Sequence, residues 1–310
     1  MLANYDCDLH GHTNQSDGND SPKEFIDHAA ERGLKVAAIT DHDVRPPGFV
    51  YVNGRKKDIL SYAQSRQVKL IRGIEISCET LIDDVHLVCF GCRWEDVFFK
   101  DLEQFTISSK VKSYKMLIKA LQENGIAVTW EEVLGNDGIR VAEEAVQKKM
   151  IFELIARKGY ADHWKNAKLL VKNSSLFNLK REKPNAVDVI HQIHVQGGIV
   201  ILAHPFLISD LVLYNGNVRS RKEFIEILIE AGLDGIEACY TYDKTSYDGK
   251  MLPNEIELYI RQTYAPRGLI ISGGSDYHAD GKKGVANPRD IGECGISLKE
   301  FEGCPRLMRL

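Results

Sequence analysis

The sequence predicts an α/β fold built on a barrel or a related closed sheet. Short apolar runs recur along the chain, and most lack the strict alternation of a sheet with one wet face, which favours strands buried on both faces of a parallel sheet. Segments with helical character lie between many of these runs. This β-α alternation is typical of α/β barrels. Residues 93–184 interrupt it with charged, helical sequence.

Seven runs are predicted to be strands because each is short and compactly apolar. In chain order they are residues 4–8, 36–40, 69–75, 84–90, 198–203, 235–238 and 269–273.

Helices are predicted between the strands. Ser21 and Glu24 form a capping box with Pro22 at the first helical position, and Gly33 supplies a stop. Further helices are expected over residues 57–66, 185–196 and 222–231. The segment Arg45–Lys56 is rich in proline, glycine and basic residues, so we expect a surface or lid loop there.

The interval 93–184 is predicted to be a helical insertion between strands four and five. Apolar residues recur with helical spacing over residues 108–124, and a second helix is expected over residues 145–157. We therefore predict a catalytic barrel of residues 1–92 and 185–310 and a helical cap subdomain of residues 93–184.

Composition narrows the class of protein. The formal net charge is −4 and the pI about 6.2, so the basic footprint of a sequence-independent nucleic-acid binder is missing. The longest apolar runs are too short to cross a bilayer, and the first residues lack a signal-peptide pattern. We expect a cytoplasmic protein with no membrane partner and no stable nucleic-acid binding. The seven cysteines favour free thiols.

Histidines and carboxylates cluster at the predicted strand ends. His10 and His12 are spaced i and i+2 on an extended chain, so their side chains project to the same side and can share one metal. Because strand ends of an α/β barrel form one rim, these polar residues should converge in space. The candidate ligands are His10, His12, Asp17, His42, Glu75, His86, His204, Asp276 and His278. Mixed histidine and carboxylate ligation suits zinc, manganese or iron.

These residues also carry a family resemblance. The run H-x-H-x-x-x-S-D-G, followed by T-D-H-D, G-x-E, a strand histidine, A-H-P and G-S-D-x-H, resembles the polymerase and histidinol phosphatase (PHP) superfamily. The resemblance implies a distorted (β/α)7 barrel with two to three metals at its carboxyl rim. It places one metal on His10, His12, Glu75 and Asp276, a second on Glu75, His86 and His204, and a third on Asp17, His42 and His278. The insertion resembles the small-molecule phosphoesterase branch, which includes nucleoside 3′,5′-bisphosphate phosphatases.

The insertion also departs from that branch. Related bisphosphatases tend to carry an arginine and a histidine beside the substrate, whereas the nearest stretch here is Ala145–Met150. Lys148 and Lys149 are candidate substrate contacts, although a lysine cannot form the bidentate fork of an arginine. A solvated helix face is the alternative for both lysines.

The expected activity is hydrolysis of a phosphate ester in a small phosphorylated metabolite. Two metals bridged by Glu75 would lower the pKa of a water and generate a metal-bound hydroxide, with Asp276 and His204 as further catalytic-site residues. Asp41 and Asp43 are candidates to orient histidines, or turn carboxylates. A nucleoside 3′,5′-bisphosphate is the first candidate substrate. The alternatives are a cyclic ribose-phosphate phosphodiesterase, a 3′-5′ exonuclease-type phosphodiesterase, hydrolysis of a non-phosphate substrate, and a non-enzymatic metal-binding protein.

Overall fold

Seven strands form the central sheet in the computed structural model of the chain, which describes residues 2–135 and 139–310. From one edge to the other they are β1 (Cys7–Asp8), β2 (Val36–Ile39), β5 (Lys69–Ser77), β6 (His86–Phe90), β7 (Ile199–Leu202), β10 (Gly235–Cys239) and β11 (Ile270–Gly273). The chain divides into two compact units. Unit 1 comprises Met1–Leu102 and Pro184–Leu310 and holds this sheet, and unit 2 comprises Glu103–Lys183.

The sheet curls into a nearly closed barrel. Neighbouring strands are parallel except β6, which is antiparallel to both β5 and β7. Backbone hydrogen bonds join the chain after β1 to the chain after β11: the Leu9 amide donates to the Gly273 carbonyl (3.1 Å) and the Asp276 amide to the His10 carbonyl (2.9 Å). The fold is therefore the predicted distorted (β/α)7 barrel. The parallel sheet that the apolar runs favour is interrupted at β6, which runs in the opposite direction.

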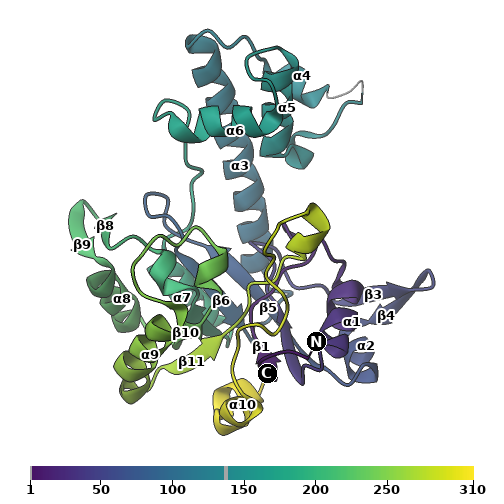
Figure 1. The fold of residues 1–310 in the computed structure, drawn as a ribbon, viewed down its shortest axis with the longest axis vertical. Helices are drawn as coiled ribbons and strands as arrows, with labels where there is room; N and C mark the ends of the chain where they lie inside the picture. Colours follow the sequence, from purple (N-terminus) through teal and green to yellow (C-terminus); the bar gives the residue numbers. More distant parts are fainter. Residues whose placement is uncertain (1, 136–138) are drawn as a thin grey trace. The chain divides into compact units, whose positions relative to one another are not determined.

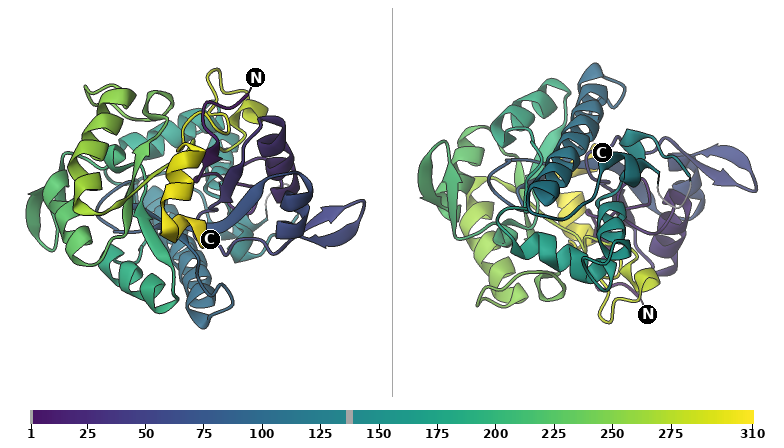
Figure 2. Two further views of the ribbon diagram at one scale, coloured as in Figure 1. Left: turned by 90° about the horizontal axis from the view of Figure 1, so that it is seen from below. Right: turned by 90° about the horizontal axis from the view of Figure 1, so that it is seen from above.

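Helices pack around the barrel of unit 1. Figure 1 shows α1 (Pro22–Glu31) and α2 (Ile59–Ser65) near one edge of the sheet, and α7 (Ala186–Val195), α8 (Arg221–Glu230) and α9 (Pro253–Tyr264) near the other. The predicted capping box of α1 is present, since Ser21 and Glu24 exchange side-chain and backbone hydrogen bonds. The terminal helices α10 (Leu298–Gly303) and α11 (Pro305–Met308) run across the sheet (Figure 2, left), and their Phe301 and Leu307 pack among interior strand residues.

Two β-hairpins lie outside the barrel sheet. The first joins β3 (Phe49–Val52) to β4 (Arg55–Asp58), so the segment predicted as a loop over Arg45–Lys56 contains β3 and the start of β4. The second joins β8 (Leu211–Tyr214) to β9 (Asn217–Ser220). Each turns at an Asn-Gly pair with positive φ at both residues, 51° and 77° in the first and 49° and 75° in the second. Positive φ at both central residues is the geometry of a type I′ turn, whose twist matches that of the strands.

Unit 2 is helical and has a core of its own. The long helix α3 (Val97–Glu123) begins in unit 1 and continues into unit 2, where α4 (Trp130–Leu134), α5 (Lys148–Arg157) and α6 (Trp164–Asn173) follow. Leu117 and Leu121 of α3 pack with Ile151 and Ile155 of α5 in this core. The compact unit starts later than the predicted boundary at residue 93. Its role as a separate cap that selects substrate stays a prediction.

Two further findings concern the whole described chain. None of its helices combines the length and the apolar character that crossing a bilayer requires. All seven cysteines are free thiols, as predicted, and Cys89 and Cys92 are buried among the apolar side chains of unit 1.

Candidate metal centre

The predicted ligands come from different strands but gather at one end of the barrel. His10 and His12 follow β1, His42 follows β2, and Glu75 lies in the last part of β5. His204 follows β7, while Asp276 and His278 follow β11. His86 is the first residue of β6 and pairs with Ser77, near the end of β5, because β6 runs antiparallel. The reversed strand therefore brings its beginning to the rim where its neighbours end.

The Glu75 carboxylate is the centre of the cluster. It is 1% exposed, and imidazole nitrogens approach both of its oxygens. Oε1 lies 2.9 Å from His86 Nδ1 and 3.0 Å from His204 Nε2. Oε2 lies 3.2, 3.1 and 3.1 Å from His10 Nε2, His12 Nε2 and His42 Nδ1. One carboxylate that faces five histidines has the arrangement expected of a bridging ligand.

Asp276 and Asp17 extend the cluster on the side of His12. Asp276 Oδ1 lies 3.0 Å from His12 Nε2 and 3.4 Å from His278 Nδ1. Asp17 Oδ1 lies 3.1 Å from His278 Nε2 and 3.8 Å from His12 Nδ1. His204 and Asp276 both hold left-handed backbone, with φ of 28° and 52°. Such strained conformations are concentrated at functional sites in proteins.

Three sets of potential ligand atoms each fall within 4.8 Å of one another. They are His10, His12, Glu75 and Asp276; His42, Glu75 and His86; and His12, Asp17, His42 and His278. The first set is the one that the family resemblance implies. The second set contains His42 in addition to the implied ligands Glu75 and His86. The third contains His12 in addition to the implied ligands Asp17, His42 and His278. His204 contacts Glu75 but is not part of a set.

Several buried polar atoms of the cluster have no hydrogen-bond partner. Among the described residues they are His10 Nε2, both ring nitrogens of His12, His42 Nδ1, Glu75 Oε2, His86 Nδ1, His204 Nδ1 and Asp276 Oδ1. A buried polar group without a partner costs free energy, so a native structure keeps one only where something else satisfies it. All of these atoms except His204 Nδ1 belong to residues of the three sets. Nitrogen and carboxylate donors in this pattern fit divalent metal ions.

The electrostatics of the cluster favour charged carboxylates. Burial acts to raise the pKa of Glu75 and Asp276, but the surrounding histidines hold the pKa of both well below its usual range. Burial acts to lower the pKa of His12, but Asp276 and Glu75 raise that pKa to about 10. Burial lowers the pKa of His42 to about 4. The carboxylates are thus available as anionic ligands.

Two residues that support the cluster were not found from the sequence. Glu237 of β10 contacts His10 Nδ1 through Oε1 (3.1 Å) and accepts a hydrogen bond from the His204 amide through Oε2 (2.8 Å). The Tyr240 hydroxyl donates to Asp276 Oδ2 (2.8 Å). Hydrogen bonds to the far side of a ligand fix its orientation.

The two aspartates expected to orient histidines hold loops. Asp41 accepts hydrogen bonds from the Thr13 amide, the Thr13 hydroxyl and the Ser16 hydroxyl, at 2.7–2.8 Å. Asp43 accepts from the amide and hydroxyl of Ser77. These contacts fit the alternative prediction, in which Asp41 and Asp43 are turn carboxylates and do not orient histidines.

A pocket of about 270 Å³ opens over the cluster and contains two cations that sequence reasoning missed. Arg289 is ion-paired with Asp276 and lies 3.0 Å from His278 Nδ1 and 3.2 Å from Asp280. Lys244 Nζ donates to Glu293 (2.6 Å). Both line the pocket beside His42, Glu75 and His204. Neither belongs to a motif with recognisable spacing, so only the folded structure reveals them.

Lys148 and Lys149 lie in unit 2, at the start of α5. Burial lowers the pKa of Lys148, and Lys149 pairs with Glu153 at 3.3 Å. Their role as substrate contacts stays a prediction.

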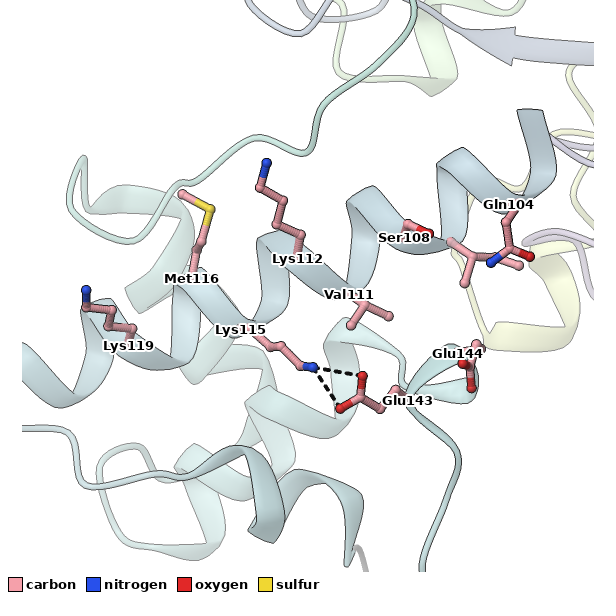
Figure 3. Close-up of a pocket in the computed structure, with 10 residues that line it drawn as sticks. Gln104, Ser108, Val111, Lys112, Lys115, Met116, Lys119, Glu143 and Glu144 are labelled. Carbon is pink, nitrogen blue, oxygen red and sulfur yellow. Dashed lines mark hydrogen bonds and ion pairs between the residues drawn. The ribbon is translucent and has the colours of Figure 1, made fainter. Parts of the chain in front are cut away.

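Unit 2 has a separate groove of about 530 Å³ along α3, and neither Lys148 nor Lys149 lines it. Its lysines are Lys112, Lys115 and Lys119, and Figure 3 shows Lys115 reaching Glu143. The groove is therefore largely charge-compensated.

The sequence of the chain is similar to that of a known protein family. The family model described as the PHP domain matches residues 8–195, more than half of the chain. The chain belongs to the PHP-domain family. The match begins just before the first ligand pair and extends past Glu75 and His86. It therefore covers six of the nine candidate ligands of this PHP protein.

Three relatives have different activities. A phosphoribosyl 1,2-cyclic phosphate 1,2-diphosphodiesterase from Eggerthella lenta is 26% identical over 87% of this chain and 93% of its own. A 3′,5′-nucleoside bisphosphate phosphatase from Chromobacterium violaceum is 26% identical over 92% of this chain and 90% of its own. A 5′-3′ exoribonuclease from Haemophilus influenzae is 28% identical over 74% of this chain and 77% of its own. All three names describe the cleavage of phosphate esters.

Proposed function

We propose that this PHP protein is a metal-dependent phosphoric ester hydrolase that acts on a small phosphorylated compound. One observation carries the proposal: the buried Glu75 carboxylate faces five histidines, and several of the facing atoms have no hydrogen-bond partner among the described residues. Unpaired buried groups of this kind need a ligand to compensate for their lost hydration.

The ligands of the proposed metals are His10, His12, Asp17, His42, Glu75, His86, His204, Asp276 and His278. We infer two to three divalent ions, manganese, zinc or iron, from the three overlapping sets of donor atoms. When bound, such ions lower the pKa of a coordinated water and neutralise charge on phosphate oxygens. Glu75 belongs to two of the sets and so links them, while Glu237 and Tyr240 hold His10 and Asp276 in place.

Arg289 and Lys244 are proposed to bind phosphate oxygens. Both line the pocket over the cluster, and both are paired with carboxylates. A phosphate that enters this pocket can take the place of a carboxylate at either cation, because guanidinium and ammonium groups bind phosphate with charge-assisted hydrogen bonds. The pocket of about 270 Å³ suits a phosphoryl group with its nearest atoms.

A nucleoside 3′,5′-bisphosphate remains the first candidate substrate. The Chromobacterium violaceum relative supports it, and the Eggerthella lenta relative supports a cyclic ribose phosphate as the second candidate. The exoribonuclease relative supports a short RNA as the third candidate substrate. The net charge of −4 favours the small molecules over a polyanionic chain.

The experiment is phosphate release from a substrate panel by the metal-replete protein. The panel holds nucleoside 3′,5′-bisphosphates, cyclic and acyclic ribose phosphates, histidinol phosphate and short oligoribonucleotides. We expect turnover of one class of small substrate that stops on addition of chelator. Cleavage of oligonucleotides alone would replace the small-molecule assignment with a nuclease. An absence of turnover on every ester would refute the proposal.

A further inference from the structure

We propose that a second cavity, next to the metal pocket, binds the sugar and base of a nucleotide, with Tyr247 against the base and Asp84 at a sugar hydroxyl. This inference rests on the proposed function, because it names the group to which the hydrolysed phosphate is attached.

The side cavity adjoins the metal pocket. It has a volume of about 710 Å³ and lies within unit 1, between residues 206–210 after β7 and residues 246–251 before α9. Asp84, Leu207 and Ser246 line both spaces. A cavity of this size lies within the usual range for small-molecule sites. A phosphate ester held over the metal cluster would therefore extend its other half into the side cavity.

Hydrogen bonds hold the wall of residues 206–210 in place. The Phe206 amide donates to the Tyr242 hydroxyl (3.2 Å), which connects the segment after β7 to the segment after β10. Arg221 donates to the Ile208 carbonyl (2.8 Å) and pairs with Asp210 (2.9 Å). Its guanidinium carbon lies 4.1 Å from the centre of the Phe206 ring. The cavity is thus a built part of the fold and does not depend on a bound ligand for its walls.

Tyr247 provides an aromatic surface that is fixed on several sides. Its ring centre lies 5.2 Å from that of Tyr242, and its amide donates to the Thr245 hydroxyl (3.2 Å). The backbone of Gly249 packs so closely that a Cβ there would clash with the Tyr247 ring and hydroxyl. A ring held in this way loses little freedom when a base stacks on it, and stacking suits any base because every base has an aromatic face.

The charges of the two spaces favour this orientation of the substrate. The metal pocket holds the cations Arg289 and Lys244, whereas the side cavity is lined by Asp248, by Asp84, which it shares with the metal pocket, and by Asp210, which is paired with Arg221. Its cations are Arg221, which Asp210 already neutralises, and the exposed Lys250. Carboxylates repel phosphate but accept hydrogen bonds from sugar hydroxyls and base amino groups. The phosphate to be cleaved thus belongs over the metals, and the sugar and base, which carry no charge of their own, belong in the side cavity.

Asp84 stands where the two spaces meet. Among the described residues its carboxylate has no hydrogen bond or ion pair, and its backbone is left-handed, with φ of 58°. An unpaired acceptor between a phosphate site and an aromatic surface is in the position of the sugar that joins phosphate to base. We therefore assign the Asp84 carboxylate to a ribose hydroxyl.

The test compares a substrate that carries the base with one that lacks it, in the wild-type chain and in a variant without the Tyr247 ring. The ratio of kcat/KM for adenosine 3′,5′-bisphosphate to that for ribose 5-phosphate is measured for the metal-loaded protein and for Tyr247→Ala. Loss of one stacking contact should lower this ratio about tenfold. Tyr247→Phe, which keeps the aromatic ring, should show nearly the wild-type ratio of kcat/KM values. Tyr51→Ala, which removes an exposed tyrosine of the β3–β4 hairpin, is the control for nonspecific effects.

Asp84→Asn tests the sugar contact. It should lower kcat/KM about fivefold for both the bisphosphate and ribose 5-phosphate, relative to methyl phosphate, which has no hydroxyl to donate. An equal effect on methyl phosphate would assign Asp84 to the metal pocket and overturn its sugar role.

Titration of adenosine into the metal-free protein by calorimetry separates this inference from the proposed function. Adenosine should bind the wild-type chain and bind Tyr247→Ala about tenfold more weakly. Unchanged binding and an unchanged substrate ratio in Tyr247→Ala would refute the nucleoside site. If no phosphate ester is hydrolysed but adenosine binding depends on Tyr247, the proposed function fails and the nucleoside site stands.

Discussion

Each of the two units gathers charged side chains, and the two groups differ in how their polar atoms are satisfied. In unit 1 the histidines and carboxylates around Glu75 are largely buried, and many of their facing atoms have no hydrogen-bond partner among the described residues. In unit 2 Lys112 and Lys115 are 61% and 45% exposed, and each is paired with a glutamate. Exposed ion pairs change the free energy of folding little, whereas a buried polar group without a partner lowers the stability of the fold. Polar atoms left unsatisfied therefore locate a ligand site better than the number of charges does.

The largest expected effect is that of Glu75→Gln. The substitution removes the anionic link between the donor sets, so turnover should fall below detection and the metal content should drop by at least one ion per chain. Elemental analysis and initial rates measure both, and circular dichroism should report an intact fold. Glu143→Gln, which breaks the Lys115 pair of unit 2, is the matched control. A near-normal rate for Glu75→Gln would show that the bridge is another residue.

Removal of metal should abolish activity and also lower the stability of unit 1. Ions that bind only the folded chain stabilise it by about 2.7 kcal/mol when their free concentration is one hundred times Kd. The chelator-treated protein should therefore unfold at a lower temperature in calorimetry, and readdition of manganese or zinc should restore both properties. Less than one metal per chain, with activity unaffected by chelator, would contradict the metal centre.

Glu237→Gln should have a smaller effect on the same centre. Glu237 contacts His10 and the His204 amide without belonging to a donor set, so it is a positioning residue. Loss of such a contact typically lowers metal affinity about 10- to 100-fold. Calorimetric titration of the metal-free protein with zinc measures this directly. An unchanged affinity together with a lower unfolding temperature would leave Glu237 a purely structural role.

The smallest expected effect is that of Lys148→Ala combined with Lys149→Ala. If unit 2 selects the substrate, KM should rise a few-fold for a substrate with a second, distal phosphate and less for a generic ester. Lys112→Ala with Lys115→Ala is the matched control, because it also removes two lysines of unit 2. Equal changes for both substrates would assign Lys148 and Lys149 to a solvated helix face.

The strands of the barrel could be located from the sequence because burial on both faces leaves compact apolar runs. The direction of β6 could not be predicted, because an apolar run has the same pattern whichever way the strand runs in the sheet. The hairpin β3–β4 was missed because Arg55, Lys56 and Lys57 make its second strand polar and fully exposed. Its Asn53-Gly54 turn, and the matching Asn215-Gly216 turn, were signals in the sequence that could have found both hairpins.

The candidate ligands could be named from the sequence because they stand in short motifs beside strand ends. The prediction for His86 rested on its place in a strand with no knowledge of the strand's direction. His86 is the first residue of β6, and it lies beside Glu75 because β6 runs antiparallel to its neighbours. Arg289, Lys244 and Glu237 carry no motif, and their places depend on how loops and neighbouring strands fold over the barrel. Tertiary structure alone supplies that information.

The backbone bonds that close the barrel have a consequence for the order of events in folding. The same two segments that seal the sheet also bear His10, His12, Asp276 and His278, and the Asp8 and Ser275 side chains that bond beneath them are 267 positions apart in the chain. Contacts at so large a separation form late, after the loop-closure entropy of the intervening chain has been overcome. A chain still emerging from the ribosome therefore lacks two of the candidate ligands until Asp276 and His278 have been synthesised, so we expect the donor set to be completed only near the end of translation.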